Sequence, residues 1–555
     1  MIHTSFSQYL HLTVLTEVIL TLNQGDPGGI TLVTDVSHSN WLDKSGHLFL
    51  RKLRRDSLGN DELTYLHQKG VFSLPHKSVS DVLIRIYFHH VHPFFPILNA
   101  KTFLAAYEDG AYDRIGIHLL WSVFLAASLF VKEETLRDAG FASRKDMKRA
   151  MYQKAKALYD MQYEKSKTTL IQAVLLMGFW YSDTQDRTGP LHWIGVAISL
   201  CQSAGLHRKS SLGTNQHNTD TEILWRQLWW ACVYRDAWYA VGQGKPMRIA
   251  IADCNTEMPS VKDCEHMYDG VEETLRAKYL PDHMDLLSQL WVDLLKLTVV
   301  LIQITITMQR DGNPGDSRAL EQKEEEILAC RQNCIALMNN TDRLAQIHVH
   351  HVELYCNSTL LVLYRPHILQ ANAKRSREIA TPFDSFIEQR AQTAAARING
   401  ILAQLIASDA VDVCQGIICM ALIPPMQIHM LNHLSKDPLV RQLHHHQLEI
   451  CMVVMKELKK TYFGAEIIYK IFENAKAQIQ SQALTLETHA GDTQSLAQGS
   501  GHIQGVMPGP SNTSNDHADQ PDDVSAVLQS LMRQHDYFDI EELDFLNFPA
   551  TSEIE

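Results

Sequence analysis

One carboxylate among tryptophans is the residue of this 555-residue sequence that most resembles a reactive group. Asp236 follows Trp225 and Trp229 at helical spacing, which places the three side chains within about 60° of one another on a helix. A carboxylate on such an apolar face costs several kcal/mol unless it is paired and hydrogen-bonded. Asp236 could be a catalytic acid, but a structural ion pair with Arg248 or Arg226 accounts better for its position.

Two histidine runs, His348 to His351 and His444 to His446, raise the question of a metal site. Adjacent histidines on a helix point in different directions, so neither run forms a ligand set by itself. The ten cysteines show no C-x-x-C spacing, which indicates neither a disulfide framework nor a tetrahedral zinc site. No metal ligand is therefore predicted.

Motifs of the common enzyme classes are absent from the sequence. It contains no P-loop, no G-x-S-x-G elbow and no H-E-x-x-H. The tryptophans Trp225, Trp229 and Trp230 could line a small-molecule pocket, but aromatic residues at helical spacing more often belong to a core. We expect no catalytic residue and no enzyme.

Two helices must position Asp236 and the tryptophans. Apolar residues recur at steps of three and four from Ile194 to Cys201, and Gly205 follows where a helix would end in a left-handed residue. A second helix is expected from about Thr219, where a Thr-x-x-Glu capping box precedes the tryptophans. The residues expected to end it are Gly242, Gly244 and Pro246.

This pair of helices resembles the middle regulatory domain of fungal zinc-cluster transcription factors, in the form found in the cutinase transcription factors. The matching residues are Gly205, Leu206, His207, Arg226, Trp229, Trp230, Arg235, Asp236, Gly244 and Pro246. Upstream, the segment from His92 to Asn99 resembles the motif that opens that domain. The resemblance is good from about Val79 to Pro259 and looser to about residue 480, and it departs from the usual pattern at Gln227, where a basic residue is more common.

The DNA-binding zinc cluster of that family is not found in this sequence. Its signature gathers six cysteines around two zinc ions so that a short helix can meet the major groove. Here the first cysteine is Cys201. We therefore expect no cofactor and no DNA-binding residue within these residues, and promoter DNA to be reached through a zinc cluster missing from them or through a partner protein.

The pattern from residue 79 to about residue 485 predicts one all-α domain. Ile115 to Val131 is apolar on all sides, as in a central helix, and strand signals are nearly lacking. After about residue 486 the composition changes to Gly, Ser, Gln, Asn, Asp and Pro, which is typical of a disordered tether. The predicted parts are a linker-like region at 1–78, the all-α regulatory domain at 79–485, a disordered linker at 486–523 and an acidic-hydrophobic tail at 524–555.

No targeting segment for secretion is predicted at the N-terminus. The apolar residues 9–22 are interrupted by Glu17 and follow no Lys or Arg, unlike a signal peptide. The run Leu119–Val131 is too short to span a membrane. The basic cluster from Arg51 to Arg55 could be a nuclear localisation signal, a linker remnant or the solvated end of a helix. We expect a soluble, reduced, intracellular protein.

The end of the chain mixes acidic and large apolar residues. Of the formal net charge of −13, residues 516–555 carry −10, from eleven acidic residues and Arg533, which leaves −3 for the rest. The large apolar residues that matter most here are crowded among the carboxylates: Phe538, Leu543, Phe545, Leu546 and Phe548. This composition is that of an acidic activation segment, which folds against an apolar groove rimmed by Lys and Arg; a helix that docks back onto the chain itself is the alternative.

Taken together, the residues and the resemblance predict a fungal nuclear regulator of RNA polymerase II genes, pathway-specific and an activator. The expected partners are the transcription machinery or a co-activator, with a possible homo-oligomer and no membrane. The alternative is a helical metabolite-sensing or protein-binding scaffold that does not contact DNA itself.

Overall fold

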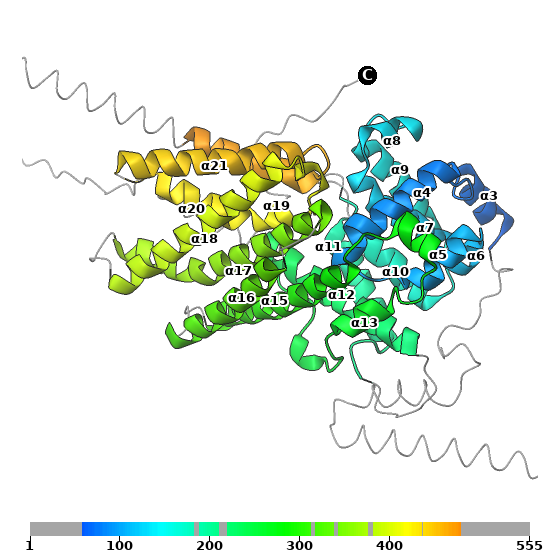
Figure 1. Ribbon diagram of the computed structural model, residues 1–555, viewed down its shortest axis with the longest axis horizontal. Coiled ribbons are helices and arrows are strands. Elements are labelled where there is room, and N and C mark those ends of the chain that lie inside the picture. Colours follow the sequence, from blue (N-terminus) through cyan, green and yellow to red (C-terminus); the bar gives the residue numbers. More distant parts are fainter. Residues whose placement is uncertain are drawn as a thin grey trace, which may run out of the picture. The chain divides into compact units, whose positions relative to one another are not determined.

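The computed structural model describes residues 58–181, 188–209, 219–311, 317–337, 342–375, 381–433, 435 and 437–478. Within these ranges the chain consists of helices joined by turns, with no strand (Figure 1). The prediction of an all-α fold is confirmed for this part of the chain.

The chain divides into two compact units. Unit 1 comprises Met1–Tyr239, Met247–Gln303 and Glu326–Glu353, and unit 2 comprises Ala240–Pro246, Ile304–Glu325 and Leu354–Glu555. The domain boundaries expected from the sequence stay predictions, and residues 1–57 and 479–555 lie outside the described residues.

Unit 1 holds most of the short helices. Those that lie wholly within it are α3 (Asn60–Gln68), α4 (Lys77–Ile86), α5 (Ala100–Glu108), α6 (Tyr112–Ile115), α7 (Ile117–Ala127), α8 (Glu133–Asp138), α9 (Arg144–Asp160), α10 (Lys167–Met177), α11 (Pro190–Ser203), α13 (Val261–His266) and α14 (Glu273–Tyr279). Those that contribute residues to both units are α12 (Thr219–Gln243), α15 (Met284–Asp311), α16 (Ser317–Ala336) and α17 (Arg343–Arg375).

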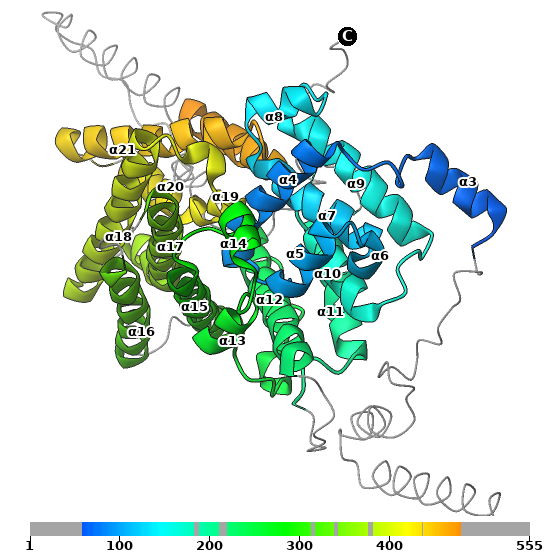
Figure 2. The same cartoon turned by 45° about the vertical axis from the view of Figure 1, so that its right-hand side comes forward.

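Helix α7 is the centre of unit 1, as its uninterrupted apolar sequence predicts. Every residue from His118 to Val131 is buried. The helix packs against α4, α9 and α10, which surround it (Figure 2). A helix that is apolar all round requires neighbours on all sides, and α7 has them.

The helix that precedes the aromatic motif at residues 92–95 does not stop at His92 in the simple way that the sequence suggests. After α4 the chain continues as a π-helical turn, Tyr87–Val91, and then as a 3-10 turn, His92–Phe94. Asn99 caps the next helix, α5, by accepting the Thr102 N–H at 3.0 Å, as its type and position predict.

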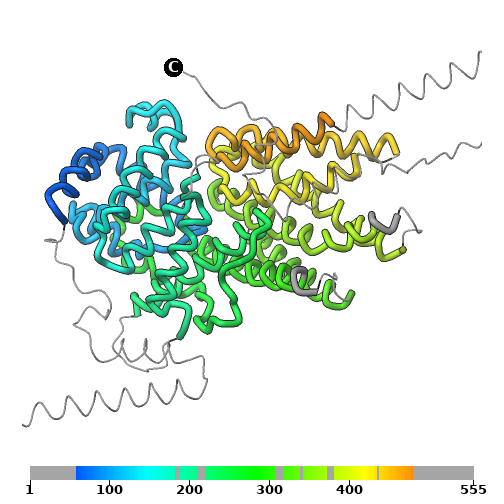
Figure 3. The backbone as a smooth tube through the Cα atoms, turned by 180° about the vertical axis from the view of Figure 1, so that it is seen from behind, coloured from blue at the N-terminus to red at the C-terminus, as the bar shows by residue number. Residues whose placement is uncertain are grey.

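The helices that lie wholly within unit 2 are α18 (Pro382–Ala407), α19 (Ile417–Ala421), α20 (Ile423–His433) and α21 (Pro438–Leu458), followed by a helical segment at 463–478. Helices α18, α20 and α21 pack against one another. In Figure 3 the yellow and orange tubes of α20 and α21 run side by side.

One described segment, Met284–Thr307 of α15, has the length and composition of a helix that could cross a membrane. Sixty-seven per cent of its most apolar window is buried, as in the core helix of a soluble fold. All ten cysteines are free, and nine of them are buried.

Candidate functional site

The corner after α11 is built on a glycine, as the sequence predicts. Gly205 has φ of +77°, a conformation that strains any residue with a Cβ. Its N–H donates to the carbonyl of Gln202 at 3.0 Å, and the N–H of Leu206 donates to Cys201 at 3.0 Å. These two bonds satisfy carbonyls at the helix end and turn the chain sharply.

The carbonyls of this corner bind a segment about 50 residues further along the chain. The Leu206 carbonyl accepts the Thr256 hydroxyl at 2.6 Å. The His207 carbonyl accepts the Asn255 N–H at 3.1 Å. The motif residues Leu206 and His207 therefore bind this segment through their backbone carbonyls.

Helix α12 binds the same segment with two side chains. Trp230 donates its indole N–H to the Glu257 carbonyl at 2.8 Å. Asp236 accepts the N–H groups of Arg248 and Ile249 on one oxygen, at 2.8 and 2.9 Å. We call this arrangement the clasp: Leu206, His207, Trp230 and Asp236 hold residues 248–257.

The structure corrects the ion pair expected for Asp236. The Arg248 guanidinium donates to the Leu191 carbonyl, and Arg226 pairs with Asp263 at 2.8 Å. Burial raises the pKa of Asp236, against the opposing effect of its two backbone hydrogen bonds and of Arg248. Two converging N–H groups satisfy the buried carboxylate, so no buried cation is required.

The other motif tryptophan, Trp229, belongs to the core. It is fully buried, and its ring centroid lies 5.8 Å from that of His207. Gln227, the position at which the family pattern is broken, is also fully buried. Its amide donates to Cys264 Sγ at 3.1 Å and accepts the Trp291 indole N–H at 2.9 Å, so both ends of this neutral side chain are satisfied.

The end of α12 follows the prediction with one change. Gly244 has φ of +61°, and the N–H of Lys245 donates to the Ala240 carbonyl at 2.9 Å, which closes the helix. Pro246 is exposed just beyond. Gly242, expected as a terminator, instead lies within the helix, where a Cβ would come within 2.7 Å of the Met420 side chain. Gly242 therefore allows the helix to pack closely against Met420 inside unit 2.

Arg235 is the motif residue whose surroundings the sequence did not indicate. It is 4% exposed, and its guanidinium lies over the rings of Phe179, Tyr239 and Phe95, with distances to the ring centroids of 4.2, 5.0 and 5.3 Å. Its Nε and Nη2 atoms have no hydrogen-bond partner. Nothing in its spacing along the chain distinguishes it from a surface arginine, because Phe95 and Phe179 come from distant segments.

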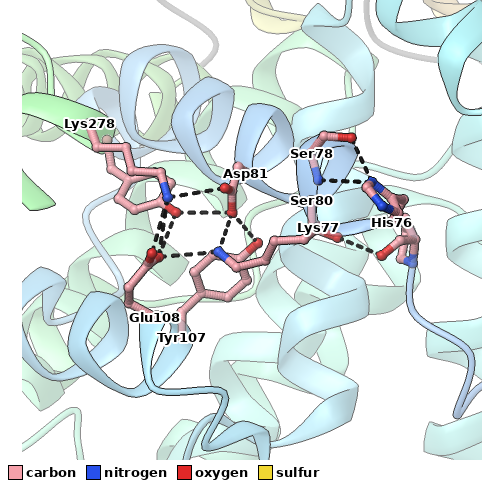
Figure 4. A network of polar contacts seen from close by, with 10 residues as sticks. His76, Lys77, Ser78, Ser80, Asp81, Tyr107, Glu108 and Lys278 are labelled. Carbon is pink, nitrogen blue, oxygen red and sulfur yellow. Dashed lines mark hydrogen bonds and ion pairs between the residues drawn. The ribbon is translucent and has the colours of Figure 1, made fainter.

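A second polar cluster joins α4, α5 and α14 (Figure 4). Asp81 accepts the Tyr107 and Tyr279 hydroxyls at 2.9 and 3.0 Å and pairs with Lys77 and Lys278. Burial by itself raises the pKa of Asp81, but these hydrogen bonds together lower it by more, so that the pKa falls to about 2. A carboxylate held in its ionised form at neutral pH is poorly suited to proton transfer. The cluster is a structural crosslink.

The histidines singled out from the sequence lie in separate places: His348 and His444 are buried, whereas His446 is exposed. His348 contacts the ring of Phe94 and bonds the His89 carbonyl at 2.8 Å, while His444 meets His429 with 3.1 Å between their Nδ1 atoms. Among the described residues, no group of three or more His, Cys, Asp and Glu could hold a metal ion. The tail residues from Phe538 to Phe548 lie outside the described part of the chain.

Comparison of the sequence with known families finds a match that covers the clasp. The family model described as "Fungal specific transcription factor domain" matches residues 84–332. This range contains the clasp, α7 and the Asp81 cluster's partners on α5 and α14, Tyr107, Glu108, Lys278 and Tyr279.

Two curated relatives are similar over most of this chain, and a third is similar over a smaller part of it. "Cutinase transcription factor 1 alpha" of Fusarium vanettenii is 29% identical over 76% of this chain and 46% of its own length. "Cutinase transcription factor 1 beta" of the same organism is 25% identical over 75% and 51%. "Transcription factor cpaR" of Aspergillus oryzae is 31% identical over 39% and 36%. The chain spans about half the length of the two cutinase factors, and all three relatives are transcription factors, not enzymes.

Among solved structures, the K. lactis CBF3 core is similar over 84% of this chain and 95% of its own, with 10% identity and a TM-score of 0.45. A likeness at that level carries no inference about function.

Proposed function

We propose that this chain, which carries a fungal-specific transcription factor domain in residues 84–332, regulates transcription of RNA polymerase II genes in a fungal nucleus. The observation that carries the proposal is the match of this domain, with the clasp inside it, to a family of transcription factors. Similarity to cutinase transcription factor 1 alpha over 76% of the chain supports it.

The regulation is proposed to be specific to a pathway. The relatives include cutinase transcription factors and acetamidase regulatory proteins, each named for one metabolic function. A regulator of this kind needs a route to promoter DNA. That route is proposed to be a zinc cluster outside these residues or a partner protein, because the first cysteine here is Cys201.

Activation is proposed to come from the acidic-hydrophobic tail at 524–555. Its aromatic and leucine side chains are interleaved with carboxylates, which suits binding to a co-activator groove with a basic rim. The partners proposed are therefore a co-activator or the transcription machinery. Self-association of the helical domain is a further proposal.

The test is a reporter assay with the whole chain fused to an unrelated DNA-binding domain. The fusion is expected to activate the reporter. Replacing Phe538, Leu543, Phe545 and Leu546 with Ala keeps every charge and is expected to abolish activation, because charge alone does not fill an apolar groove. The matched control replaces four polar tail residues, Gln529, Ser530, Gln534 and Asn547, with Ala and is expected to remain active.

A silent fusion that is expressed and nuclear would contradict the activator proposal and favour the scaffold alternative. Activity that survives loss of the four apolar residues would remove the tail from the mechanism.

A further inference from the structure

The most exposed large apolar side chains of the described residues belong to one helix. Leu439, Val453 and Leu443 of α21 are 76%, 55% and 53% exposed, more than any other large apolar side chain in this part of the chain. The opposite face of α21, which includes Leu448 and Met455, is buried. The helix packs against α18 and α20, so its exposed apolar face is an additional surface of unit 2.

The exposed side chains form a continuous stripe. Leu439, Leu443, His446, Ile450 and Val453 follow one another at alternating steps of four and three residues, which places them within about 80° of one another on the helix. His446 is exposed, and Ile450 is half-buried. We call these five residues the α21 stripe. Alternating steps of four and three are typical of a helix that packs lengthwise against a second helix, so the partner expected is an amphipathic helix.

The α21 stripe is too small for a stable contact between two copies of the chain. It is about 21 Å long and as wide as one helix, about 10 Å, which gives roughly 200 Å². Stable interfaces between proteins bury about 800 Å² on each partner, several times the area of this stripe. A partner that is tethered to α21 can bind through a smaller area, because its local concentration is high.

The chain beyond the described residues begins beside the stripe. The last described segment, 463–478, contacts α21 through an ion pair between Lys476 and Glu449 at 2.5 Å, and Glu449 precedes Ile450 of the stripe. Residues 479–523 follow, a length of 45 residues. For a random coil of that length the mean end-to-end distance is about 34 to 40 Å, which exceeds the length of the stripe. Any segment that follows residue 523 is therefore present at the stripe at a concentration on the order of millimolar.

One segment of the remaining sequence has the spacing that fits the stripe. In residues 524–535, Val524, Leu528, Leu531 and His535 recur at the same steps, four, three and four, as the first four residues of the stripe. No acidic residue lies between Asp523 and Asp536, which distinguishes this segment from the acidic residues that follow it. As a helix, the segment would present one apolar face.

We propose that residues 524–535 dock as an amphipathic helix on the α21 stripe of the same chain. The apolar side chains of the two helices pack against one another along the stripe. Lys456 and Lys460 are exposed at its C-terminal end, where Lys460 also pairs with Glu457. Carboxylates flank the docking segment on both sides and meet these lysines in either direction of the segment: Asp522, Asp523 and Asp536.

Docking would anchor the acidic segment that begins at Asp536 beside α21 and leave its aromatic side chains outside the interface. This inference goes beyond the proposed function and does not rest on it, because docking can be observed whether or not the chain activates transcription.

The contact is tested by photocrosslinking in the full 555-residue chain. The crosslinking residue p-benzoyl-phenylalanine replaces Leu443, which is exposed on the stripe. The protein is irradiated at micromolar concentration, and the crosslinked peptides are identified by mass spectrometry. We expect crosslinks to residues 524–535 within single chains. The same probe in place of Tyr65, an exposed aromatic residue of α3, is the matched control and is expected to give no crosslink to that segment.

Two pairs of substitutions identify the face of the segment that docks. Leu528→Asp with Leu531→Asp places two charges on the apolar face, and this change is expected to abolish the crosslink. Gln529→Asp with Ser530→Asp adds the same two charges on the opposite face, and the crosslink is expected to persist.

Amide hydrogen exchange measures docking without a probe. We expect the amides of residues 527–532 to exchange at least about tenfold more slowly than those of an unfolded chain. Leu443→Asp with Val453→Asp is expected to remove this protection. Both positions are exposed, so the urea midpoint of the described helices should stay unchanged in this variant.

A crosslinked dimer would overturn the proposal, because it would show that a second copy covers the stripe. Crosslinks only to other parts of the chain, or crosslinks that survive Leu528→Asp with Leu531→Asp, would also overturn it. So would the absence of any crosslink together with unprotected amides at 527–532. A silent reporter fusion in which docking is intact would instead refute the proposed activation and leave this inference standing.

Discussion

The carboxylate of Asp236 accepts the backbone N–H of Ile249 at 2.9 Å, thirteen residues further along the chain. This bond and the neighbouring one from the Arg248 N–H hold the start of the segment at residues 248–257. Trp230 and the Leu206–His207 corner bind the other end of the same segment. Four of the motif residues, Leu206, His207, Trp230 and Asp236, thus act together on one segment, residues 248–257, and the first two do so through backbone carbonyls.

Removing the Asp236 carboxylate should leave two N–H groups without acceptors, that of Ile249 buried and that of Arg248 partly buried. We expect Asp236→Ala to lower the free energy of unfolding by about 2 to 4 kcal/mol, measured by urea denaturation. Asp236→Asn should retain most of the stability, since its amide oxygen can accept the same bonds.

The control for an ion pair is Arg248→Ala, which leaves the backbone N–H in place. We expect a change of less than about 1 kcal/mol, because the exposed guanidinium contributes little. If Arg248→Ala were as damaging as Asp236→Ala, the side chain and not the backbone would be the true partner.

Two adjacent tryptophans should respond differently to substitution. Trp229 is fully buried, so Trp229→Ala should cost about 3 to 5 kcal/mol through the cavity it leaves. Trp230→Phe keeps the aromatic packing and loses only the N–H that binds the Glu257 carbonyl, which should cost about 1 to 2 kcal/mol. Trp229→Phe is the matched comparison. Equal losses for the two Phe variants would argue against a specific role for the Trp230 N–H.

Acid should destabilise unit 1 through its buried histidines. Burial lowers the pKa of His90, His92 and His118 to about 3, and it lowers that of His348 well below the ordinary value. Between these values and about 6.5, the unfolded chain binds more protons than the folded chain. The stabilisation is therefore complete above about pH 6.5 and is lost as the pH falls, at up to about 1.4 kcal/mol per pH unit for each histidine.

The measurement is the urea midpoint at several pH values between 7.5 and 5. His118→Leu should flatten the dependence, whereas His446→Gln, a change at an exposed position, should leave it as it is. A midpoint that does not change across this range would show that the buried histidines are already protonated or solvated.

The chain as given should bind DNA weakly and without sequence preference. Specific binding requires side chains in a groove and neutralisation of phosphates by Lys and Arg. Outside residues 516–555 the net charge is only −3, with no basic excess. We expect no shift of a DNA probe at physiological salt and no stoichiometric zinc in the purified protein. Tight, sequence-selective binding would refute this.

Local signals in the sequence were sufficient for the helical fold class and for several helix ends. Gly205 and Asn99 could be assigned because a left-handed helix end and an N-cap depend on residues within a few positions. The burial of α7 followed from its composition. The π-helical turn at Tyr87–Val91 had no such signal, since it depends on the surrounding packing.

Only part of the candidate site could be predicted from the sequence. Asp236 was recognised as a buried carboxylate that needs partners, and the sequence favoured an arginine side chain as that partner. The true partners are backbone N–H groups, which every residue except proline has, so no residue type in the sequence marks them. The surroundings of Arg235 were missed for a related reason: Phe95 and Phe179 reach it from segments that no periodicity connects to α12.

Rapid depletion of the protein in its native host, followed by sequencing of nascent transcripts, tests the central claim most directly. A regulator of RNA polymerase II genes should cause a limited set of transcripts to fall before growth slows, and re-expression of the intact chain should restore them. A nascent transcript profile that stays unchanged after complete depletion, under conditions in which the protein is normally present, would contradict the assignment of this chain to transcription.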